Sequence, residues 1–362
     1  MFNKIAVIGA GNGGKATAAD LALQGKKVKL FEFPEFAGNL EAIKEKRQLH
    51  VSGALEGIAQ LECVTSNIAE VLEDVDTIVV ATQSLTHERT AKEIAPYVND
   101  KQLLILNPNS VSGALIFLKI FQEENVSGIP AIASFSTLSY GCRAKDDQVD
   151  IAVKVNYFET GVFPASRTRE ITGEIKKYFP GAVPVEDVLA AGLSNANPVI
   201  HPPIAILNGA RFENPGVVYF YKDGVSPKTA RLIELLDEER IKLKKALGYK
   251  TMTDPELSVK QGYAESDEYY ECYSKGRGYS NFTAPDTLNH RYFHEDVGIG
   301  LVLYCQLGEI LGVKTPASRA VIAMGSLISE EDYLSRQEEI AAASGIDKVS
   351  RAQLLEYLQT GS

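Results

Sequence analysis

Residues 4–15 read KIAVIGAGNGGK. The apolar residues 5–8 predict a buried β-strand, and the pattern Gly9-x-Gly11-x-x-Gly14 follows it directly. Glycine at these positions permits a tight turn at Gly9, close approach of a pyrophosphate at Gly11 and close packing of helix on sheet at Gly14. The amides and the positive dipole of the following helix favour phosphate groups. The stretch therefore predicts a Rossmann fold at the start of the chain.

An acidic residue lies where this fold contacts the adenosine ribose. Glu32 ends the predicted second strand, VKLFE, 18 residues after Gly14. An acid there accepts hydrogen bonds from the ribose hydroxyls and repels a 2′-phosphate. A glycine turn without nucleotide and an FAD site are the alternatives, although FAD proteins usually carry more fingerprints. We expect NAD as the cofactor, with NADP as a second option, bound by Gly9, Gly11, Asn12, Gly13, Gly14 and Glu32.

The length of 362 residues predicts two domains, because a single core rarely grows beyond about 250–300 residues. Short apolar runs alternate with helical patterns in the first half, which is typical of an α/β domain with a parallel sheet. The later patterns are helical and include residues 227–247 and 295–311. We expect a Rossmann NAD(P)-binding domain over residues 1–186 and an all-helical substrate domain over residues 187–362.

Further expectations concern single segments of these two domains. Four more strands are predicted in the parallel sheet, at residues 76–81, 102–106, 131–134 and 150–155. Within the helical domain, residues 263–294 are rich in Tyr, Ser and Gly and predict a long irregular loop. A long loop inside a compact domain is often functional.

Composition excludes several classes of function. The net charge of −10 and the dispersed basic residues argue against nucleic-acid binding. No apolar run reaches the roughly 18–20 residues that span a bilayer. No metal-ligand spacing such as HExxH appears, so no metal site is expected. Four scattered cysteines and no signal-peptide pattern predict free thiols and a cytoplasmic location. A homodimer is allowed for, although the sequence carries no specific signal for one.

Five histidines provide the candidates for acid–base chemistry near neutral pH. His201 lies in LSNANPVIHPP, residues 193–203, a rigid polar turn that we expect beside the cleft between the domains. A core or capping histidine is the alternative. In NHRYFHED, residues 289–296, Arg291 is suited to a bidentate grip on a carboxylate, and Asp296 could orient an imidazole. A helix cap with a surface ion pair is the alternative there.

Two of these segments, with the glycine pattern, resemble the opine dehydrogenase family of the octopine/nopaline dehydrogenase type. Asn197-Pro198-x-x-His201-Pro202 is similar to its histidine motif, and Arg291-Tyr292-x-x-Glu295-Asp296-Val297 to its Arg and Asp motif. The resemblance implies a Rossmann domain followed by a helical domain, with the substrate in the cleft. It also implies NAD(P)H-dependent reductive condensation of an amino acid with a 2-oxo acid to an N-(carboxyalkyl) amino acid.

The resemblance further implies roles for single residues. His201 would be the acid/base and Asp296 its partner, while Arg291 and Asn197 would bind substrate. Two other functions share the plan of a Rossmann domain followed by helices. One is a reductase of a simple 2-oxo or hydroxy acid, similar to ketopantoate reductase or glycerol-3-phosphate dehydrogenase, although those usually employ a lysine. The other is a dinucleotide-binding sensor without catalysis, which would be supported if His201 or Asp296 pointed away from the cleft.

Overall fold

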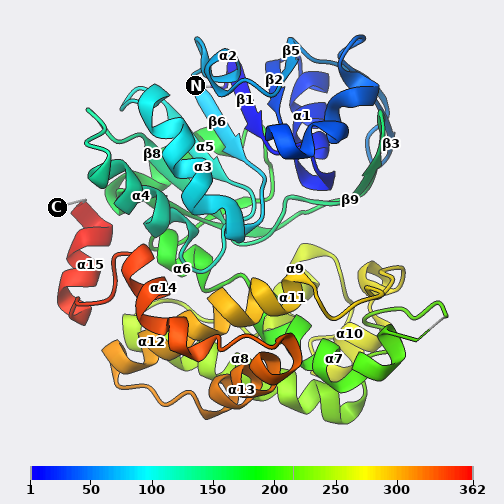
Figure 1. Ribbon diagram of the computed structural model, residues 1–362, viewed down its shortest axis with the longest axis vertical. Helices are drawn as coiled ribbons and strands as arrows, with labels where there is room; N and C mark the ends of the chain where they lie inside the picture. The colour runs from blue at the N-terminus through cyan, green and yellow to red at the C-terminus, as the bar shows by residue number, and fades with distance from the viewer. Residues whose placement is uncertain (1, 215, 361–362) are drawn as a thin grey trace. The chain divides into compact units, whose positions relative to one another are not determined.

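The computed structural model describes residues 2–214 and 216–360, which form two compact units (Figure 1). One unit holds the residues up to Gly192 and the last described residues from Leu358, and the other is Leu193–Tyr357. The sequence placed the change of domain at residues 186/187, whereas helix α6 (Val188–Gly192) packs with the first unit. Close approach explains this, because a Cβ on Gly161 would lie 1.8 Å from the carbonyl oxygen of Asp187.

An eight-stranded sheet forms the centre of the N-terminal unit. The strands at its centre are almost completely buried, which agrees with the continuous apolar runs in the sequence. The order is β12 (Ala182–Pro184), β11 (Phe158–Phe163), β8 (Ala131–Phe135), β7 (Leu103–Leu106), β6 (Thr77–Val80), β1 (Lys4–Ile8), β2 (Lys27–Phe31) and β5 (Cys63–Thr65). The predicted α/β class is confirmed, but the sheet is mixed, because β11 pairs antiparallel with β8.

The helices of this unit connect its strands, except for α6, which follows the last strand. They are α1 (Asn12–Leu23), α2 (Ile68–Leu72), α3 (His87–Ile94), α4 (Gly113–Glu123), α5 (Thr168–Ile175) and α6. Helix α1 follows β1 and packs against both β1 and β2. Gly25, with φ +79°, follows this helix before β2 begins. The β1–α1–β2 unit predicted from the glycine pattern is therefore present.

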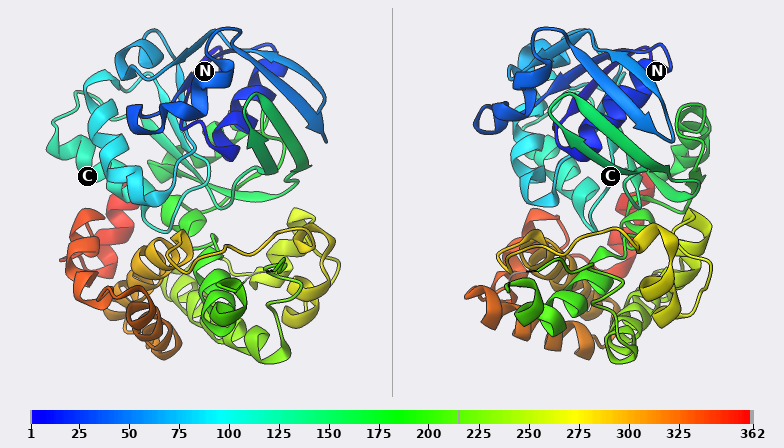
Figure 2. Two further views of the ribbon diagram at one scale, coloured as in Figure 1. Left: turned by 45° about the vertical axis from the view of Figure 1, so that its right-hand side comes forward. Right: turned by 90° about the vertical axis from the view of Figure 1, so that its right-hand side faces the viewer.

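A second sheet of four strands covers α1, and the sequence did not predict it. Its order is β4 (Gly57–Gln60), β3 (Gln48–Gly53), β10 (Gln148–Lys154) and β9 (Tyr140–Lys145), and Figure 2 shows its blue and green strands beside α1. The expectation that residues 150–155 join the parallel sheet is wrong. Residues of β10 alternate between buried and exposed from Gln148 to Ile151, as in a strand with one solvated face.

The C-terminal unit is helical. Its helices are α7 (Asn197–Phe212), α8 (Pro227–Leu247), α9 (Asp254–Gln261), α10 (Tyr269–Lys275), α11 (Arg291–His294), α12 (Val302–Leu311), α13 (Pro316–Ser329) and α14 (Gln337–Ala343), and α15 (Arg351–Thr360) follows. Helix α8 has the predicted bounds. Ser226 caps its start, and Gly248, with φ +87°, ends it. It packs against α7, α10, α12 and α13, so it forms the centre of the helical unit.

A buried ion pair on α8 ties the beginning of this unit to its centre. Arg240 donates to Asp237 at 2.6 Å, and neither side chain is exposed. The same guanidinium donates to the carbonyl oxygens of Leu193 at 3.0 Å and Met252 at 2.8 Å. Because every one of these partners lies within the unit, the pair fixes the chain just before α7 begins.

The tyrosine-rich segment 263–294 is more ordered than predicted. It contains α10 and α11, so the expectation of a long irregular loop is only partly correct. Two of its tyrosines satisfy buried acids: Tyr269 donates to Asp237 at 2.7 Å and Tyr273 to Asp254 at 2.5 Å. Paired carboxylates inside the unit therefore explain part of the tyrosine content.

Candidate active site

The glycine turn of the N-terminal unit has the geometry of a phosphate-binding loop. Gly9 has φ +100°, and a Cβ on Gly14 would lie 1.7 Å from the carbonyl oxygen of Gly9. A Cβ on Gly11 would meet nothing within 4 Å, and no side chain caps the first amides of α1. The turn is thus tight where it meets the sheet and open in front of the helix. These features fit a dinucleotide pyrophosphate.

Asn12 and Gly13 shape this turn through contacts with the neighbouring segments of the chain. The Asn12 side-chain oxygen accepts from the backbone amide of Ala144 at 2.8 Å, so it fastens the turn to β9. A Cβ on Gly13 would lie 2.9 Å from a methyl group of Leu138. Both positions therefore shape the loop, and the side chain of Asn12 is already committed to the protein.

Glu32 also holds the glycine turn. Its carboxylate accepts hydrogen bonds from the amides of Ala10 at 2.9 Å and Phe33 at 3.0 Å, and from the Asn39 side chain at 3.0 Å. The residue is only 6% exposed. The sequence predicted a contact from Glu32 to ribose, but it did not reveal these protein donors, because Asn39 belongs to no recognised motif.

The C-terminal unit brings two of the predicted residues into direct contact. His201, in the second turn of α7, shares a hydrogen bond of 2.8 Å between Nδ1 and Oδ2 of Asp296, which lies 95 residues later. On the other side of the ring, Nε2 lies 3.0 Å from the hydroxyl oxygen of Tyr221. All three residues are buried. The sequence analysis missed Tyr221, whose signal is weak: a YFY run, residues 219–221, without any defined spacing.

A π-helical turn delivers Asp296 to the histidine. The sequence predicted a helix over residues 295–311. The helix is present as far as Leu311, but its first part, residues 296–301, is a π-helix and not an α-helix. Helix α11 begins at Arg291, and residues 296–301 form a π-helix in which the amides of Ile299 and Gly300 both donate to the carbonyl of Glu295 at 3.0 Å. Such turns often occur at functional sites.

Close packing of α7 against this turn sets the separation of the pair. A Cβ on Gly300 would lie 2.4 Å from Cγ of Pro198, so only glycine allows this approach. Asn197 is the first residue of α7, one turn before His201, and its amide donates to the side chain of Asn195 at 3.1 Å. Asn197 and His201 therefore lie on the same face of α7.

Burial determines the charge state of the pair. Burial lowers the pKa of His201 below its ordinary value of 6.5, although the carboxylate of Asp296 opposes the shift. Burial also raises the pKa of Asp296, opposed by His201 and Arg291. We assign a neutral ring with its proton on Nδ1, donating to the carboxylate, so Nε2 is an acceptor. The stabilisation from this neutral ring is complete above pH 6.5 and is lost as the pH falls through the folded-state pKa.

Arg291 lies next to this pair and has an acidic neighbour. Its guanidinium donates to Glu295 at 3.3 Å and lies 5.3 Å from the ring centre of Tyr292. The side chain is 34% exposed. The ion pair considered as an alternative in the sequence analysis is therefore present. A guanidinium has five N–H donors, so this bond does not prevent it from holding a carboxylate.

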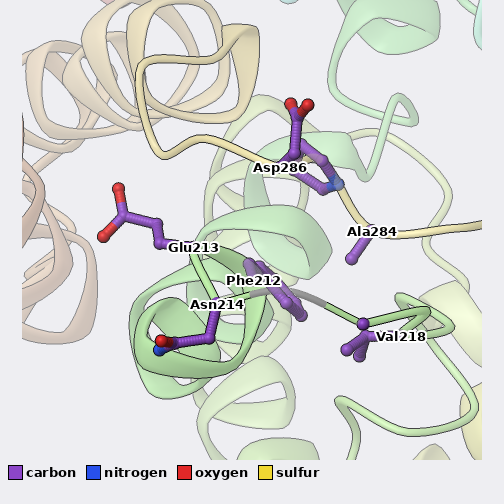
Figure 3. A pocket seen from close by; sticks show the side chains of 8 residues that line it. Phe212, Glu213, Asn214, Val218, Ala284 and Asp286 are labelled. Atoms are coloured by element: carbon purple, nitrogen blue, oxygen red, sulfur yellow. The ribbon is translucent and has the colours of Figure 1, made fainter.

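A pocket lies at the C-terminal end of α7, and its lining includes Phe212, Glu213 and Asn214 from one segment and Ala284 and Asp286 from another (Figure 3). Glu213 also accepts from the amide of Leu288 at 3.4 Å. The lining of this pocket does not include His201, Asp296 or Tyr221. Across residues 2–214 and 216–360, no helix is long and apolar enough to cross a bilayer, and no group of His, Cys, Asp and Glu is arranged to hold a metal ion.

The charge state of His201 can be measured directly. At pH 7 we expect the ¹⁵N resonances of labelled His201 to show a neutral ring protonated on Nδ1. Asp296→Asn removes the carboxylate charge that supports the imidazolium, so the pKa of His201 should fall further. Titration by NMR provides the test. A ring protonated on both nitrogens at pH 7, or a pKa that does not fall in the variant, would contradict the assignment.

Comparison with known proteins distinguishes the two halves of the chain. Residues 184–329 match the family model of the NAD/NADP octopine/nopaline dehydrogenase α-helical domain, and residues 5–141 match that of ketopantoate reductase PanE/ApbA. The chain is 33% identical over 331 residues to an opine dehydrogenase of Arthrobacter sp. (strain 1C), a match that covers 91% of both chains.

Solved structures agree on the fold. Octopine dehydrogenase in complex with NADH and agmatine superposes with a TM-score of 0.80 at 17% identity, covering 99% of this chain and 98% of that one. An octopine dehydrogenase structure described with NADH and pyruvate superposes with a TM-score of 0.75 at 18% identity, with the same coverage. The predicted Rossmann domain followed by a helical domain is therefore confirmed. The chain belongs to the opine dehydrogenase family and is an NAD(P)-dependent oxidoreductase that acts on CH–NH bonds.

Proposed function

We propose that this enzyme condenses the amino group of an amino acid with a 2-oxo acid and reduces the product to an N-(carboxyalkyl) amino acid. The hydrogen bond between His201 and Asp296 is the observation that carries this proposal, because it provides a buried base supported by a carboxylate. The Arthrobacter relative supports the reaction class. The structural relative described with pyruvate supports a 2-oxo acid as one substrate.

The residues of the helical unit would manage the protons of the condensation. The ammonium group of the amino acid must lose a proton before its nitrogen can attack the carbonyl carbon, and neutral His201 can accept that proton. Asp296 then stabilises the imidazolium. The same proton can return to the hydroxyl of the carbinolamine, which leaves as water and yields a protonated imine (an iminium ion). Protons are thus balanced between the two steps.

The N-terminal unit would hold the dinucleotide. Gly9, Gly11 and the first amides of α1 would take the pyrophosphate, and Glu32 would contribute a negative charge close to the ribose. Bound NADH supplies the hydride that reduces the imine carbon. We propose NAD as the preferred cofactor on the basis of Glu32. We also propose a cytoplasmic location, since all four cysteines are free thiols, and retain the homodimer as a proposal.

The requirement for two substrates is the first test. NADH oxidation should need both an amino acid and a 2-oxo acid, supplied as a matrix of amino acids against pyruvate, 2-oxoglutarate and oxaloacetate. In His201→Ala we expect kcat to fall about 10²–10⁴-fold while the Kd for NADH stays unchanged. His50→Ala, which alters an exposed histidine paired with Asp147, is the control. Oxidation with the 2-oxo acid alone would favour the simple reductase instead.

Arg291 is proposed to hold the carboxylate of the 2-oxo acid. Arg291→Lys keeps the charge but loses the planar fork of donors, so we expect a higher KM for the 2-oxo acid and a kcat lower by about 10–100-fold. Glu295→Gln is the matched variant, because it removes the ion pair and leaves the guanidinium intact. If both variants lowered Tm alike and left the kinetics unchanged, Arg291 would be a structural residue only.

Cofactor choice depends on Glu32 in this proposal. The wild type should use NADH better than NADPH. Glu32→Gln removes the charge and places an NH2 group against the amide of Phe33 or against the donors of Ala10 and Asn39, so the preference should narrow several-fold and Tm should fall. Glu62→Gln, at an exposed acid of the same unit, controls for net charge. Equal kcat/KM for both cofactors in the wild type would remove the proposed role.

A further inference from the structure

The histidine proposed as the base has no uncommitted ring nitrogen. Nδ1 of His201 is bonded to Asp296 at 2.8 Å, and Nε2 faces the Tyr221 hydroxyl at 3.0 Å. The neutral tautomer assigned above makes Nε2 an acceptor, so Tyr221 donates its proton to it. A proton that arrives from outside must therefore either displace Tyr221 or pass through its hydroxyl group.

Aromatic rings also pack against the imidazole of His201. The ring of Tyr292 lies 4.2 Å from the ring centre of His201 at an angle of 33°, and Phe220 approaches edge-on at 5.7 Å. His201 as a whole is 4% exposed. The hydrogen bond to the Tyr221 hydroxyl is therefore the contact through which Nε2 can exchange a proton.

Tyr221 itself is held in place by other aromatic rings. Its ring lies 4.6 Å from that of Tyr279 and meets Phe220 edge-on at 5.0 Å and Phe282 edge-on at 5.8 Å. Tyr279 is in turn anchored by a hydrogen bond of 2.7 Å between its hydroxyl group and Ser258. These three neighbouring rings oppose a movement of Tyr221 away from the histidine. A proton is therefore more easily passed through the Tyr221 hydroxyl than delivered to Nε2 after Tyr221 has been displaced.

We infer that Tyr221 is the outer member of a proton relay, Asp296–His201–Tyr221, and that its hydroxyl exchanges protons between the substrate and His201. In the condensation, an N–H bond of the substrate ammonium breaks and its proton binds the Tyr221 oxygen. The original hydroxyl proton moves at the same time to Nε2, which produces an imidazolium beside the Asp296 carboxylate. The return of the proton to the carbinolamine hydroxyl reverses both transfers, so no charge remains on Tyr221.

The Tyr221 hydroxyl is suited to passing a proton on but not to carrying a negative charge itself. Burial raises the pKa of Tyr221 well above 10, so the group stays neutral at working pH. The titratable and charged side chains that influence Tyr221 or His201 include Asp254, Tyr263, His290, Arg291, Tyr292, Glu295 and Asp296. A phenol that cannot ionise alone can still transfer one proton while it accepts another. The inference rests on the proposed function for the identity of the substrate, but not for the geometry of the relay.

The test uses the full-length enzyme with Tyr221→Phe, which keeps the ring packing and removes only the hydroxyl. We expect kcat for NADH oxidation with both substrates to fall about 10–100-fold, with an unchanged Kd for NADH. This is less than the loss in His201→Ala, because a water molecule can partly replace the hydroxyl. Tyr333→Phe is the matched control: its hydroxyl contacts another histidine, His294, at 2.9 Å, and its loss should leave kcat unchanged.

A double variant distinguishes a relay from a structural role. If Tyr221 acts through His201, then His201→Ala with Tyr221→Phe should be no slower than His201→Ala alone, whereas independent effects would multiply. A Tyr221→Phe enzyme with kcat within about twofold of wild type, or multiplicative losses in the double variant, would overturn the relay.

The proposed function can fail separately. A wild type that needs no amino acid would refute the condensation but not the relay. The relay would then be tested without substrate, by the ¹⁵N resonance of His201 Nε2, which should move in Tyr221→Phe and stay in place in Tyr333→Phe. An Nε2 resonance that is identical in Tyr221→Phe and wild type would overturn the hydrogen bond on which the relay depends.

Discussion

The buried hydrogen bond between His201 and Asp296 is the interaction on which the helical unit of this enzyme depends. A carboxylate removed from water is costly unless a partner and hydrogen bonds compensate it. His201, which precedes Asp296 by 95 residues in the sequence, supplies that partner. The π-helical turn at residues 296–301 and the glycine contact between Gly300 and Pro198 make the approach sterically feasible. Irregular backbone is therefore located at the buried His201–Asp296 pair.

In the N-terminal unit, hydrogen bonds from the protein itself hold the glycine turn in place. The glycine turn is held by the protein before any cofactor binds, through Glu32 on one side and Asn12 on the other. Residues that would contact a dinucleotide are thus also the ones that shape its loop. A second sheet packs on α1 and reinforces the same helix. Preorganisation of this kind reduces the cost of ordering the site when the ligand binds.

The family model that names octopine/nopaline dehydrogenases covers the helical unit rather than the nucleotide-binding half. The N-terminal residues match a ketopantoate reductase model, while the helical residues match the octopine/nopaline dehydrogenase domain. A dinucleotide fold hosts many reactions, so it cannot identify one. The His201–Asp296 bond and the neighbouring Arg291 lie within the residues that match the octopine/nopaline dehydrogenase domain.

The sequence alone was sufficient for features encoded by local pattern. The glycine turn, the buried parallel strands, the bounds of α8 and the family motifs around His201 and Asp296 are all readable within short windows, since backbone conformation and periodicity act locally. Tertiary structure decided the rest. Contacts between distant segments placed β10 in a second sheet and brought Tyr221 to the histidine. They also engaged the Glu32 carboxylate with donors from Ala10, Phe33 and Asn39. The helix predicted to start at residue 295 became a π-helix over its first turns. No short window contains both partners of the His201–Asp296 bond, because packing of whole helices sets the distance between them.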